Sequence, residues 1–395
     1  MKRLLVVCFL LSIAIFTHAQ NIKSQVVVLG NSGAATAAAY QAALSGVKTT
    51  LVLGADDFDV FGQLTNFDSG FEGRLKKKMR ELEQVPDSVK INITPSSVNK
   101  ALFSWADSIQ NLNVIKSTSW IKTEKAGSGW IVRLQDGKNI RSGVLVLGVK
   151  ENEGDFYKYT PHVSGQKLDY TSSLYRTSLA GYSIQNTPFI LTMDKVLVPE
   201  IENLVLVNSD DSNMVIGQAA GVVAAYGQFF SVKTSQTKLK GAQGEMLAFN
   251  QELIPVSDIS GTDKNWRAIQ NILQSGVLKL EMGTEGSKFN PDSLVTIEEI
   301  DQATRAYFYK AQLWMEDHEE AVFTLEKALD LIAYTRNKSL QNTINEVEKK
   351  WKNSYHFTQE FDKSKPITRR EFAAIALDYF QLDQVNVDKN GVVIR

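Results

Sequence analysis

The chain has 395 residues, of which 43% are hydrophobic and 22% are charged, an ordinary composition for a globular protein of two or three domains. Its formal net charge of −1 gives no reason to expect binding to nucleic acid or to an anionic membrane. The one cysteine, Cys8, lies near the start of the chain. Residues 21–395 therefore exclude disulfides, iron–sulfur clusters and a thiol nucleophile. The histidines beyond residue 20 are too scattered in sequence to indicate a metal site, and we expect none.

Residues 1–20 have the pattern of a secretory signal peptide. Lys2 and Arg3 precede the apolar run 4–16, and the sequence THAQ at 17–20 offers a small-residue cleavage site. The apolar run is too short to span a bilayer as a helix, and no second stretch is apolar enough to do so. We therefore expect an exported protein, periplasmic or extracellular, that does not span a membrane. Removal of the signal leaves 41 basic and 44 acidic residues.

Residues 21–255 begin with a β-α-β pattern. The apolar run 26–29 predicts a strand, the small residues of 34–44 a helix, and 49–53 a second strand. Strands that are hydrophobic on both faces are typical of a parallel sheet. Further along we expect helices at 73–83 and 96–111, a small β-meander with strands at 114–123, 130–134 and 144–147, and a strand, a loop and a helix within 201–225.

The turn after the first strand has the pattern of a dinucleotide-binding βα unit. The complete fingerprint has three glycines, for a tight turn, for close approach to a pyrophosphate and for close helix packing. Gly30 retains the first position, Ser32 stands at the second and Ala35 at the third, while Gly33 offers a partial substitute for the second. Any α/β protein that starts a helix close to a sheet also needs such a turn. The candidate cofactor-binding residues of the turn are Gly30, Asn31, Ser32, Gly33, Ala34 and Ala35.

Three blocks of residues 21–255 resemble the FAD-dependent oxidoreductases, the glutathione-reductase-like flavoproteins with two dinucleotide-binding folds. The blocks are 26–53, 189–207 and 216–225, the last with the sequence IGQAAGVVAA. The resemblance implies an α/β fold, a Rossmann-like FAD/NAD(P)-binding domain with a small β-meander, and FAD as the cofactor. It also implies that a loop near Gly62 borders the flavin and that a helix starting near Gly217 approaches it. That helix adds Gly217, Gln218 and Ala219 to the candidate cofactor-binding residues.

The chain departs from the flavoprotein pattern at several points. Leu53 stands where the family has an acid that binds the ribose, and the loop at 61–65 keeps only one glycine. Losing a hydrogen bond to a charged acceptor costs roughly 1.5–3 kcal/mol, about a ten- to hundredfold loss of affinity. Little of a substrate domain fits between Asp155 and Pro199, and the sequence assigns no catalytic residue. Two hypotheses stay open. The first is flavin-mediated redox chemistry on an unknown small molecule. The second is a non-catalytic envelope protein that uses the fold as a scaffold, with the C-terminal region binding a cell-wall polymer or an envelope partner.

The remainder of the chain, 256–395, is mainly helical in pattern. Two pieces within it resemble each other, because each has a threonine followed three residues later by a glutamate just before an apolar helix. This spacing predicts capping boxes, formed by Thr296 with Glu299 and by Thr368 with Glu371. Between these pieces, 316–355 is a long charged amphipathic stretch that predicts a packed helical face.

These two pieces resemble S-layer homology modules, the helical wall-binding repeats of exported bacterial proteins. The resemblance gives one repeat at 256–310 and a partial second repeat within 311–395. In that family a Thr-Arg-Ala-Glu motif contributes to a groove that grips an acidic cell-wall polymer, and a guanidinium binds carboxylates in a bidentate way. The alternative is a small helical domain with ordinary capped helices. The candidate polymer-binding residues are Trp266, Thr368, Arg369 and Glu371.

Overall fold

The computed structural model describes residues 21–64, 68–87, 89–148, 163–207, 214–318 and 322–394. The predicted signal peptide lies outside the described residues. The chain forms two compact units, each assembled from separate stretches of sequence. Unit 1 comprises 1–64, 78–163 and 197–236, and unit 2 comprises 65–77, 164–196 and 237–395. Unit 2 thus includes 164–196, which the sequence had suggested to be part of the N-terminal domain.

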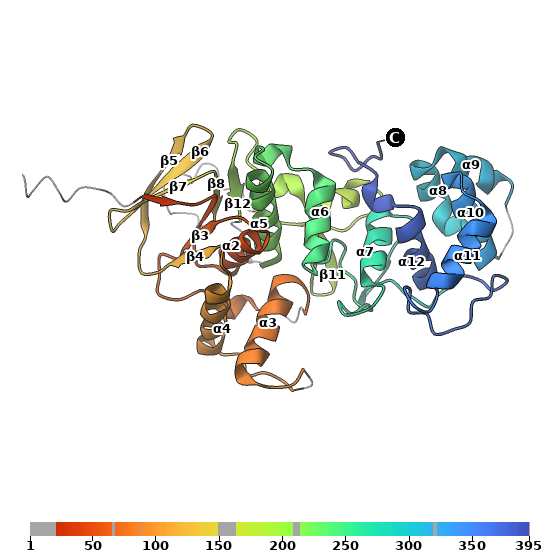
Figure 1. Ribbon diagram of the computed structural model, residues 1–395, viewed down its shortest axis with the longest axis horizontal. Coiled ribbons are helices and arrows are strands. Elements are labelled where there is room, and N and C mark those ends of the chain that lie inside the picture. The colour runs from red at the N-terminus through yellow and green to blue at the C-terminus, as the bar shows by residue number, and fades with distance from the viewer. Residues whose placement is uncertain are drawn as a thin grey trace, which may run out of the picture. The chain divides into compact units, whose positions relative to one another are not determined.

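A five-stranded parallel sheet forms the centre of unit 1 (Figure 1). Its strands are β2 (Val26–Leu29), β3 (Thr49–Val52), β4 (Leu112–Ile115), β8 (Val144–Leu147) and β12 (Leu204–Leu206). Their spatial order is β12-β8-β2-β3-β4, and every neighbouring pair is parallel. The chain therefore adds β3 and β4 on one side of β2 and then β8 and β12 on the other. This is the strand order of a Rossmann-like sheet, and its topological switch point lies between β2 and β8. The predicted fold class is confirmed.

The β-meander packs as a second, four-stranded sheet of unit 1. Its antiparallel strands are β5 (Trp120–Ala126), β6 (Gly129–Leu134) and β7 (Asn139–Ser142), and β1 (Asn21–Lys23) pairs in parallel with β7. The expected single strand over 114–123 was wrong. It is divided between β4 and β5, because Ser117 adopts a left-handed conformation with φ of 56° and ends the extended run. The expected last meander strand, 144–147, is β8 of the parallel sheet.

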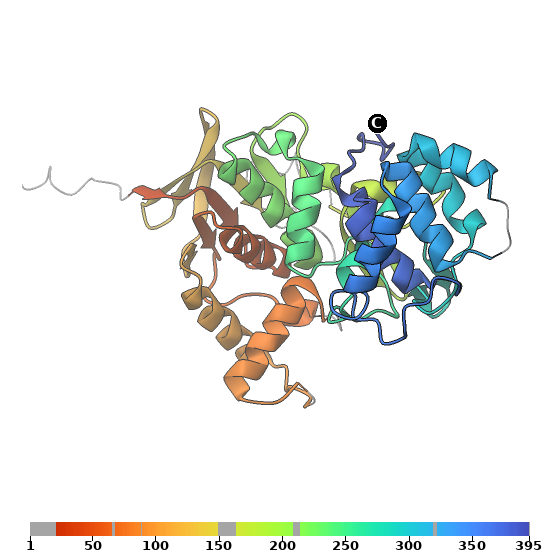
Figure 2. The same cartoon turned by 45° about the vertical axis from the view of Figure 1, so that its right-hand side comes forward.

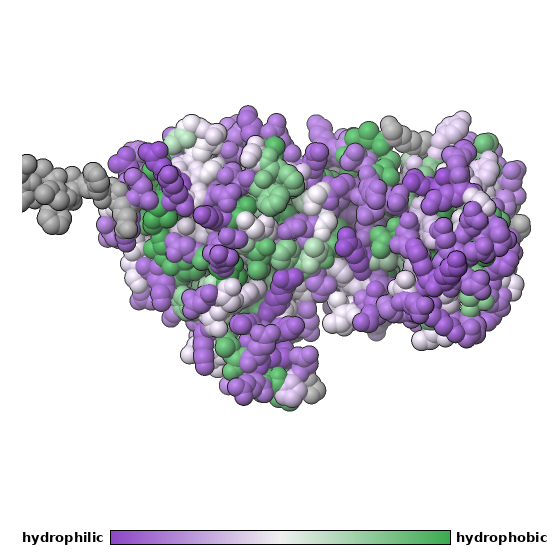
Figure 3. Space-filling model, in the orientation of Figure 1, coloured by the Kyte–Doolittle hydropathy of each residue, from purple (hydrophilic) through white to green (hydrophobic). Residues whose placement is uncertain are grey.

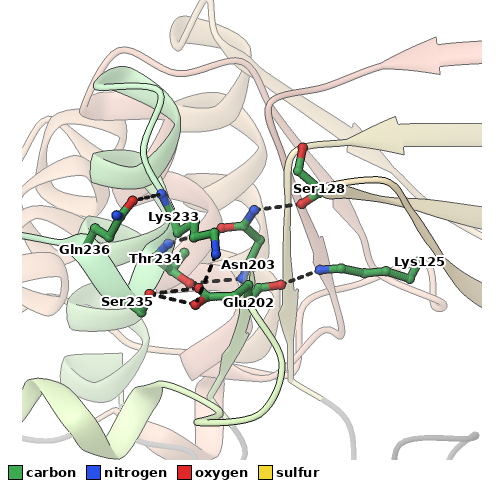
Figure 4. A network of polar contacts seen from close by, with 8 residues as sticks. All are labelled: Lys125, Ser128, Glu202, Asn203, Lys233, Thr234, Ser235 and Gln236. Carbon is green, nitrogen blue, oxygen red and sulfur yellow. Dashed lines mark hydrogen bonds and ion pairs between the residues drawn. The ribbon is translucent and has the colours of Figure 1, made fainter.

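A polar network joins the meander to the parallel sheet (Figure 4). Asn203, which precedes β12, donates its side-chain amide to the Ser128 carbonyl at 2.7 Å. It also exchanges two hydrogen bonds of 3.1 Å with Thr234, just beyond the end of α5. Ser235 and the ammonium of Lys125 bind the neighbouring Glu202. The groups that hydrogen-bond to Asn203 in this network, from Ser128 and Thr234, are neutral. Together they fix the start of β12.

Two helices of unit 1 pack tightly through small residues. They are α2 (Gly33–Leu44) and α5 (Met214–Phe229), and a third helix, α4 (Pro95–Ser108), lies beside β4. A Cβ on Gly217 would collide with the Ala34 backbone, and one on Gly221 would lie 2.5 Å from the Ala38 carbonyl oxygen. The small residues of both helices therefore allow close helix–helix contact. A short 3₁₀ helix, η1 (Phe61–Gln63), follows β3, and α3 (Gly70–Glu83) crosses the boundary between the units.

Unit 2 combines a small antiparallel sheet with helices. The sheet contains β9 (Gln166–Lys167), β10 (Ser178–Ile184) and β11 (Thr187–Thr192), and α6 (Leu239–Ala248) packs on β10. A separate hairpin is formed by β13 (Glu281–Gly283) and β14 (Gly286–Lys288). No helix among the residues described here is long and apolar enough to cross a membrane. The remaining helices are α7 (Trp266–Ser275), α8 (Ile297–Tyr307), α9 (Tyr309–Glu316), α10 (Leu325–Arg336), α11 (Leu340–Lys350) and α12 (Arg369–Tyr379).

In sequence these last helices follow one another as three helix pairs, α7–α8, α9–α10 and α11–α12, the last of them drawn in blue in Figure 2. In space α7 packs on α12, α8 on α9, and α10 on both α9 and α11. The second helix of each pair begins after an apolar residue and a threonine N-cap, namely Thr296, Thr324 or Thr368. The three capping segments pair with one another: the Val295 N–H donates to the Ile367 carbonyl at 3.0 Å, and the Ile367 N–H donates to Phe323 at 3.1 Å. The pattern therefore occurs three times, where the sequence had suggested one repeat and a partial second.

Candidate functional site

The turn between β2 and α2 retains the tight geometry of a dinucleotide site. Gly30 has φ of 127°, a conformation that residues with a Cβ rarely adopt. A Cβ there would also lie 2.5 Å from the carbonyl oxygen of Gly148, which follows β8. The Gly148 N–H in turn donates to the Leu29 carbonyl at 2.9 Å. Gly30 therefore performs the first role of the fingerprint, and it does so at the topological switch point, where ligands of such sheets bind.

The N-terminus of α2 is bonded to groups of the chain itself. Ser32 is the N-cap, and its hydroxyl accepts the Ala35 N–H at 3.2 Å. The Gly33 N–H donates to the side-chain oxygen of Gln63 at 2.6 Å. The Asn31 carbonyl accepts the N–H of Asp59 at 2.8 Å. The backbone donor that would face a pyrophosphate is therefore bonded to an oxygen acceptor from η1.

The end of β3 carries no carboxylate in the position that binds a ribose. Leu53 is 2% exposed, so an apolar side chain fills that position. Asp56, three residues later, accepts a hydrogen bond from the Ser117 hydroxyl. Asp57 is exposed and lies outside the register of the strand. This position therefore offers no charged acceptor to a ribose hydroxyl.

The other predicted cofactor residues lie in two different environments. Gly62 is exposed in η1, and no atom would lie within 4 Å of a Cβ added to it. Gly217, Gln218 and Ala219 are buried in α5. Gly217 lies against the Ala34 backbone of α2, and the Gln218 amide donates to the Gln41 side-chain oxygen at 3.0 Å. Their described contacts are therefore helix-packing contacts. The preceding segment, 208–213, and 149–162 after β8 lie outside the described residues.

The N-terminus of α2 suits a pyrophosphate oxygen chemically, because it already binds an oxygen acceptor of the chain. A carboxamide oxygen and a phosphate oxygen are both hydrogen-bond acceptors, and Gly33 holds the former at 2.6 Å. The first turn of α2 contains no acidic residue, so the partial positive charge of the helix N-terminus has no counter-charge from its own helix. An anionic ligand would satisfy both requirements. Sequence reasoning missed Gln63, although it stands beside the predicted Gly62.

Arg369, predicted to bind a polymer, lies inside unit 2. It is 4% exposed, and each of its three nitrogens donates to a protein acceptor. Nε binds the Phe289 carbonyl at 2.6 Å, another nitrogen binds the Lys279 carbonyl at 2.5 Å, and the third pairs with Glu299. Burial raises the pKa of Glu299, while the Arg369 charge opposes that rise. Thr296 caps α8 as predicted, but the Glu299 carboxylate that would complete its capping box binds Arg369 instead.

The other candidate polymer-binding residues are structural in their described contacts. Thr368 and Glu371 form the predicted capping box: the Glu371 carboxylate accepts the Thr368 N–H at 2.8 Å. Glu371 also binds the Gln359 amide and is buried. Trp266 is 4% exposed, and its indole N–H has no acceptor among the described residues.

A polar groove of about 300 Å³ lies beside the N-terminus of α12. Its charged groups include Lys264, exposed to solvent, and Arg370, which binds both carboxylate oxygens of Asp263 at 2.7 Å. Arg370 stands where the Thr-Arg-Ala-Glu motif has its alanine. In the view of Figure 3, the surface over the helix pairs is predominantly hydrophilic. The groove is lined by Asp263, Lys264, Asn265, Asp292, His356, Phe357, Thr358, Gln359, Thr368 and Arg370.

Comparison with known proteins gives matches among solved structures only; no protein-family model and no curated protein matches the chain. Cyclohexanone monooxygenase is 17% identical with a TM-score of 0.25, over 34% of this chain and 28% of that one. The flavin monooxygenase of Stenotrophomonas maltophilia is 17% identical with a TM-score of 0.24, over 32% and 38%. The p-nitrophenol 4-monooxygenase PnpA of Pseudomonas putida DLL-E4 is 9% identical with a TM-score of 0.31, over 57% and 84%. The chain spans less than half the length of the first two, and all three of these proteins are named as monooxygenases.

Proposed function

We propose that unit 1 binds an adenine dinucleotide, with FAD as the candidate, at the carboxyl ends of β2 and β8. The function that follows is flavin-mediated redox chemistry on a small molecule. One observation carries the proposal: the Gly33 N–H, at a helix N-terminus beside the switch point, already holds an oxygen acceptor at 2.6 Å. This position is where Rossmann-like folds bind a pyrophosphate.

Different residues of the chain would hold the cofactor and shape its site. Gly33 and the N-terminus of α2 would bind the pyrophosphate, and Gly30 and Gly148 keep the two strand ends close enough to form the turn. FAD, when bound, supplies the hydride-transfer chemistry, and the protein supplies position and electrostatics. The missing ribose carboxylate at Leu53 lowers the affinity by about ten- to hundredfold. We therefore expect a weak, exchangeable cofactor.

The visible absorption spectrum of the chain from Asn21 onward tests this proposal. We expect a flavin band after incubation with excess FAD, together with a rise in melting temperature that scales with FAD concentration. A spectrum without a flavin band after brief desalting, combined with an unchanged melting temperature at millimolar FAD, would contradict the proposal.

We propose as a second candidate that the protein is an exported envelope protein whose helix pairs bind an acidic cell-wall polymer. The observation that favours this function is the threefold helix-pair pattern together with the polar groove beside α12. Lys264 is an exposed cation of that groove, and the groove lies next to the predicted motif at Thr368. In this case unit 1 would serve as a scaffold, and no flavin chemistry would be needed.

Sedimentation with purified cell-wall material tests the second candidate. We expect the protein to pellet with the wall fraction, and Lys264→Ala to pellet less. Lys349→Ala removes an exposed cation of α11 outside the groove and is the matched control. Equal pelleting of the two variants, or no pelleting of the unchanged protein, would exclude a polymer site at this groove.

A further inference from the structure

The segment that carries Gln63 is anchored before it reaches the nucleotide site. The Phe58 N–H donates to the Asn99 side chain of α4 at 2.8 Å, and the Phe58 and Phe103 rings pack with their centroids 4.8 Å apart. Val60 is completely buried. The Asp59 backbone meanwhile bridges to Ser32 of the turn. Residues 58–60 are therefore fixed on the core of unit 1, and they present the following 3₁₀ helix to the N-terminus of α2.

The 3₁₀ helix itself is held much less firmly. None of the residues of η1 is buried, and Phe61 is 42% exposed. A Cβ on Gly62 would meet no atom within 4 Å. The Gln63 side chain nevertheless makes the 2.6 Å hydrogen bond to Gly33. Movement of 61–63 would thus break this contact without pulling an apolar side chain out of the core.

The contact pairs a neutral acceptor with a site that favours an anion. Hydrogen bonds to ionised acceptors are roughly twice as strong as those between neutral groups. The helix N-terminus adds a preference for negative charge, which a carboxamide does not satisfy. A phosphate oxygen would therefore compete well with the Gln63 oxygen for the Gly33 N–H, provided that the side chain leaves.

We propose that the Gln63 carboxamide is an intramolecular ligand that occupies the pyrophosphate position and must be displaced before a dinucleotide binds. This inference rests on the proposed dinucleotide function and names the residue that regulates its affinity. The apparent affinity equals the intrinsic affinity multiplied by the fraction of molecules in which the position is open. One hydrogen bond of ordinary net strength lowers that fraction by roughly two- to tenfold.

Two substitutions at this position have opposite expected effects. Gln63→Ala removes the competing acceptor and should bind FAD roughly two- to tenfold more tightly than the unchanged chain. Gln63→Glu places a carboxylate at the helix N-terminus, which strengthens the internal contact and repels phosphate, so it should bind FAD more weakly. Gln135→Ala, at an exposed position of the β6–β7 turn, is the matched control.

The experiment is titration calorimetry of the chain from residue 21 onward with FAD and, separately, with inorganic pyrophosphate. Circular dichroism and melting temperature check that each variant is folded. The affinity order Gln63→Ala, then unchanged chain, then Gln63→Glu supports the inference. If all of them bind FAD equally, the inference is wrong and the proposed function stands. If none binds FAD but Gln63→Ala alone gains pyrophosphate binding, the inference stands and FAD is excluded. If no variant binds either ligand, both proposals are overturned.

Discussion

The two units differ in where they place charge. All the charged side chains that are buried among the described residues belong to unit 2. The described core of unit 1 is apolar, and its buried polar contacts, such as Gln41 with Gln218 and Asn203 with Thr234, join neutral groups. The buried charged residues of unit 2 are Glu72, Lys76, Arg176, Glu252, Arg369 and Glu371.

The difference in buried charge between the units is also seen at the N-termini of two helices, α12 and α2. In unit 2, α12 is capped locally by Thr368 and Glu371, and a carboxylate of its own first turn faces the helix dipole. In unit 1, the side-chain acceptors described at the N-terminus of α2 are neutral: the Ser32 hydroxyl and the carboxamide of Gln63, 30 residues from Gly33. The first arrangement is complete by itself, whereas the second leaves a position that suits an anion. The charged groups of unit 2 are therefore paired within the fold, whereas the uncharged terminus of α2 in unit 1 is the position for which we propose a ligand.

The largest effect should come from breaking the charged network. Arg369→Ala removes the donors to Phe289 and Lys279 and leaves the partly buried Glu299 without its partner. Removing one member of a buried ion pair costs about 3–5 kcal/mol. Denaturant unfolding followed by circular dichroism should show this loss, with Lys349→Ala as the exposed control. A loss below about 1 kcal/mol would mean that Arg369 is dispensable for the fold and would reopen its predicted role in polymer binding.

The corresponding test in unit 1 concerns the close packing of α5 against α2. Gly217→Ala places a methyl group against the backbone of Ala34, where α5 and α2 are in contact. Overpacking of this kind costs about 1–3 kcal/mol. Gly62→Ala, where nothing lies within 4 Å, is the control and should change the free energy of unfolding by less than about 0.5 kcal/mol. If the two variants unfold alike, the close approach of α2 and α5 is not required for stability.

A third test follows how stability depends on pH through Glu252, a buried acid of unit 2. Burial raises the pKa of Glu252 in unit 2 to about 8, from 4.5. A carboxyl whose pKa is higher in the folded state stabilises the fold below pH 4.5, and that stabilisation is lost as the pH rises towards 8. The stability of Glu252→Gln relative to the unchanged chain should therefore rise with pH, by about 2–3 kcal/mol between pH 5 and pH 7. A stability difference that does not change between these pH values would show that Glu252 is ionised in the fold.

The fold was predictable where the signals are local. The apolar run Val26–Leu29, the glycine turn and the small-residue helix are contiguous, and they appear in the structure within one residue of the expected bounds. The division between β4 and β5 was not predictable, because it depends on the left-handed conformation of Ser117, a residue type that has no strong preference for it. Sequence periodicity alone continues the strand through this position.

The candidate sites were less predictable, because long-range contacts decide them. Arg369 follows a capping threonine, where an exposed side chain is the usual expectation, yet its partners Phe289 and Glu299 are 80 and 70 residues away. The same holds for Gln63, whose contact with Gly33 joins a loop to a helix N-terminus. The third copy of the pattern, in α9–α10, was not predictable from the capping spacing, because Lys327 stands three residues after Thr324, where the other two copies have a glutamate.

The smallest expected effect tests whether this third copy is equivalent to the others. Thr324→Ala removes the hydroxyl that accepts the Lys327 N–H at 3.3 Å, and losing such a cap costs about 1 kcal/mol. Thr368→Ala also breaks a full capping box, because Glu371 loses its reciprocal partner, and should cost more. Denaturant unfolding of both variants gives the comparison. Equal losses would mean that the glutamate at the third helical position adds nothing to the cap of α12.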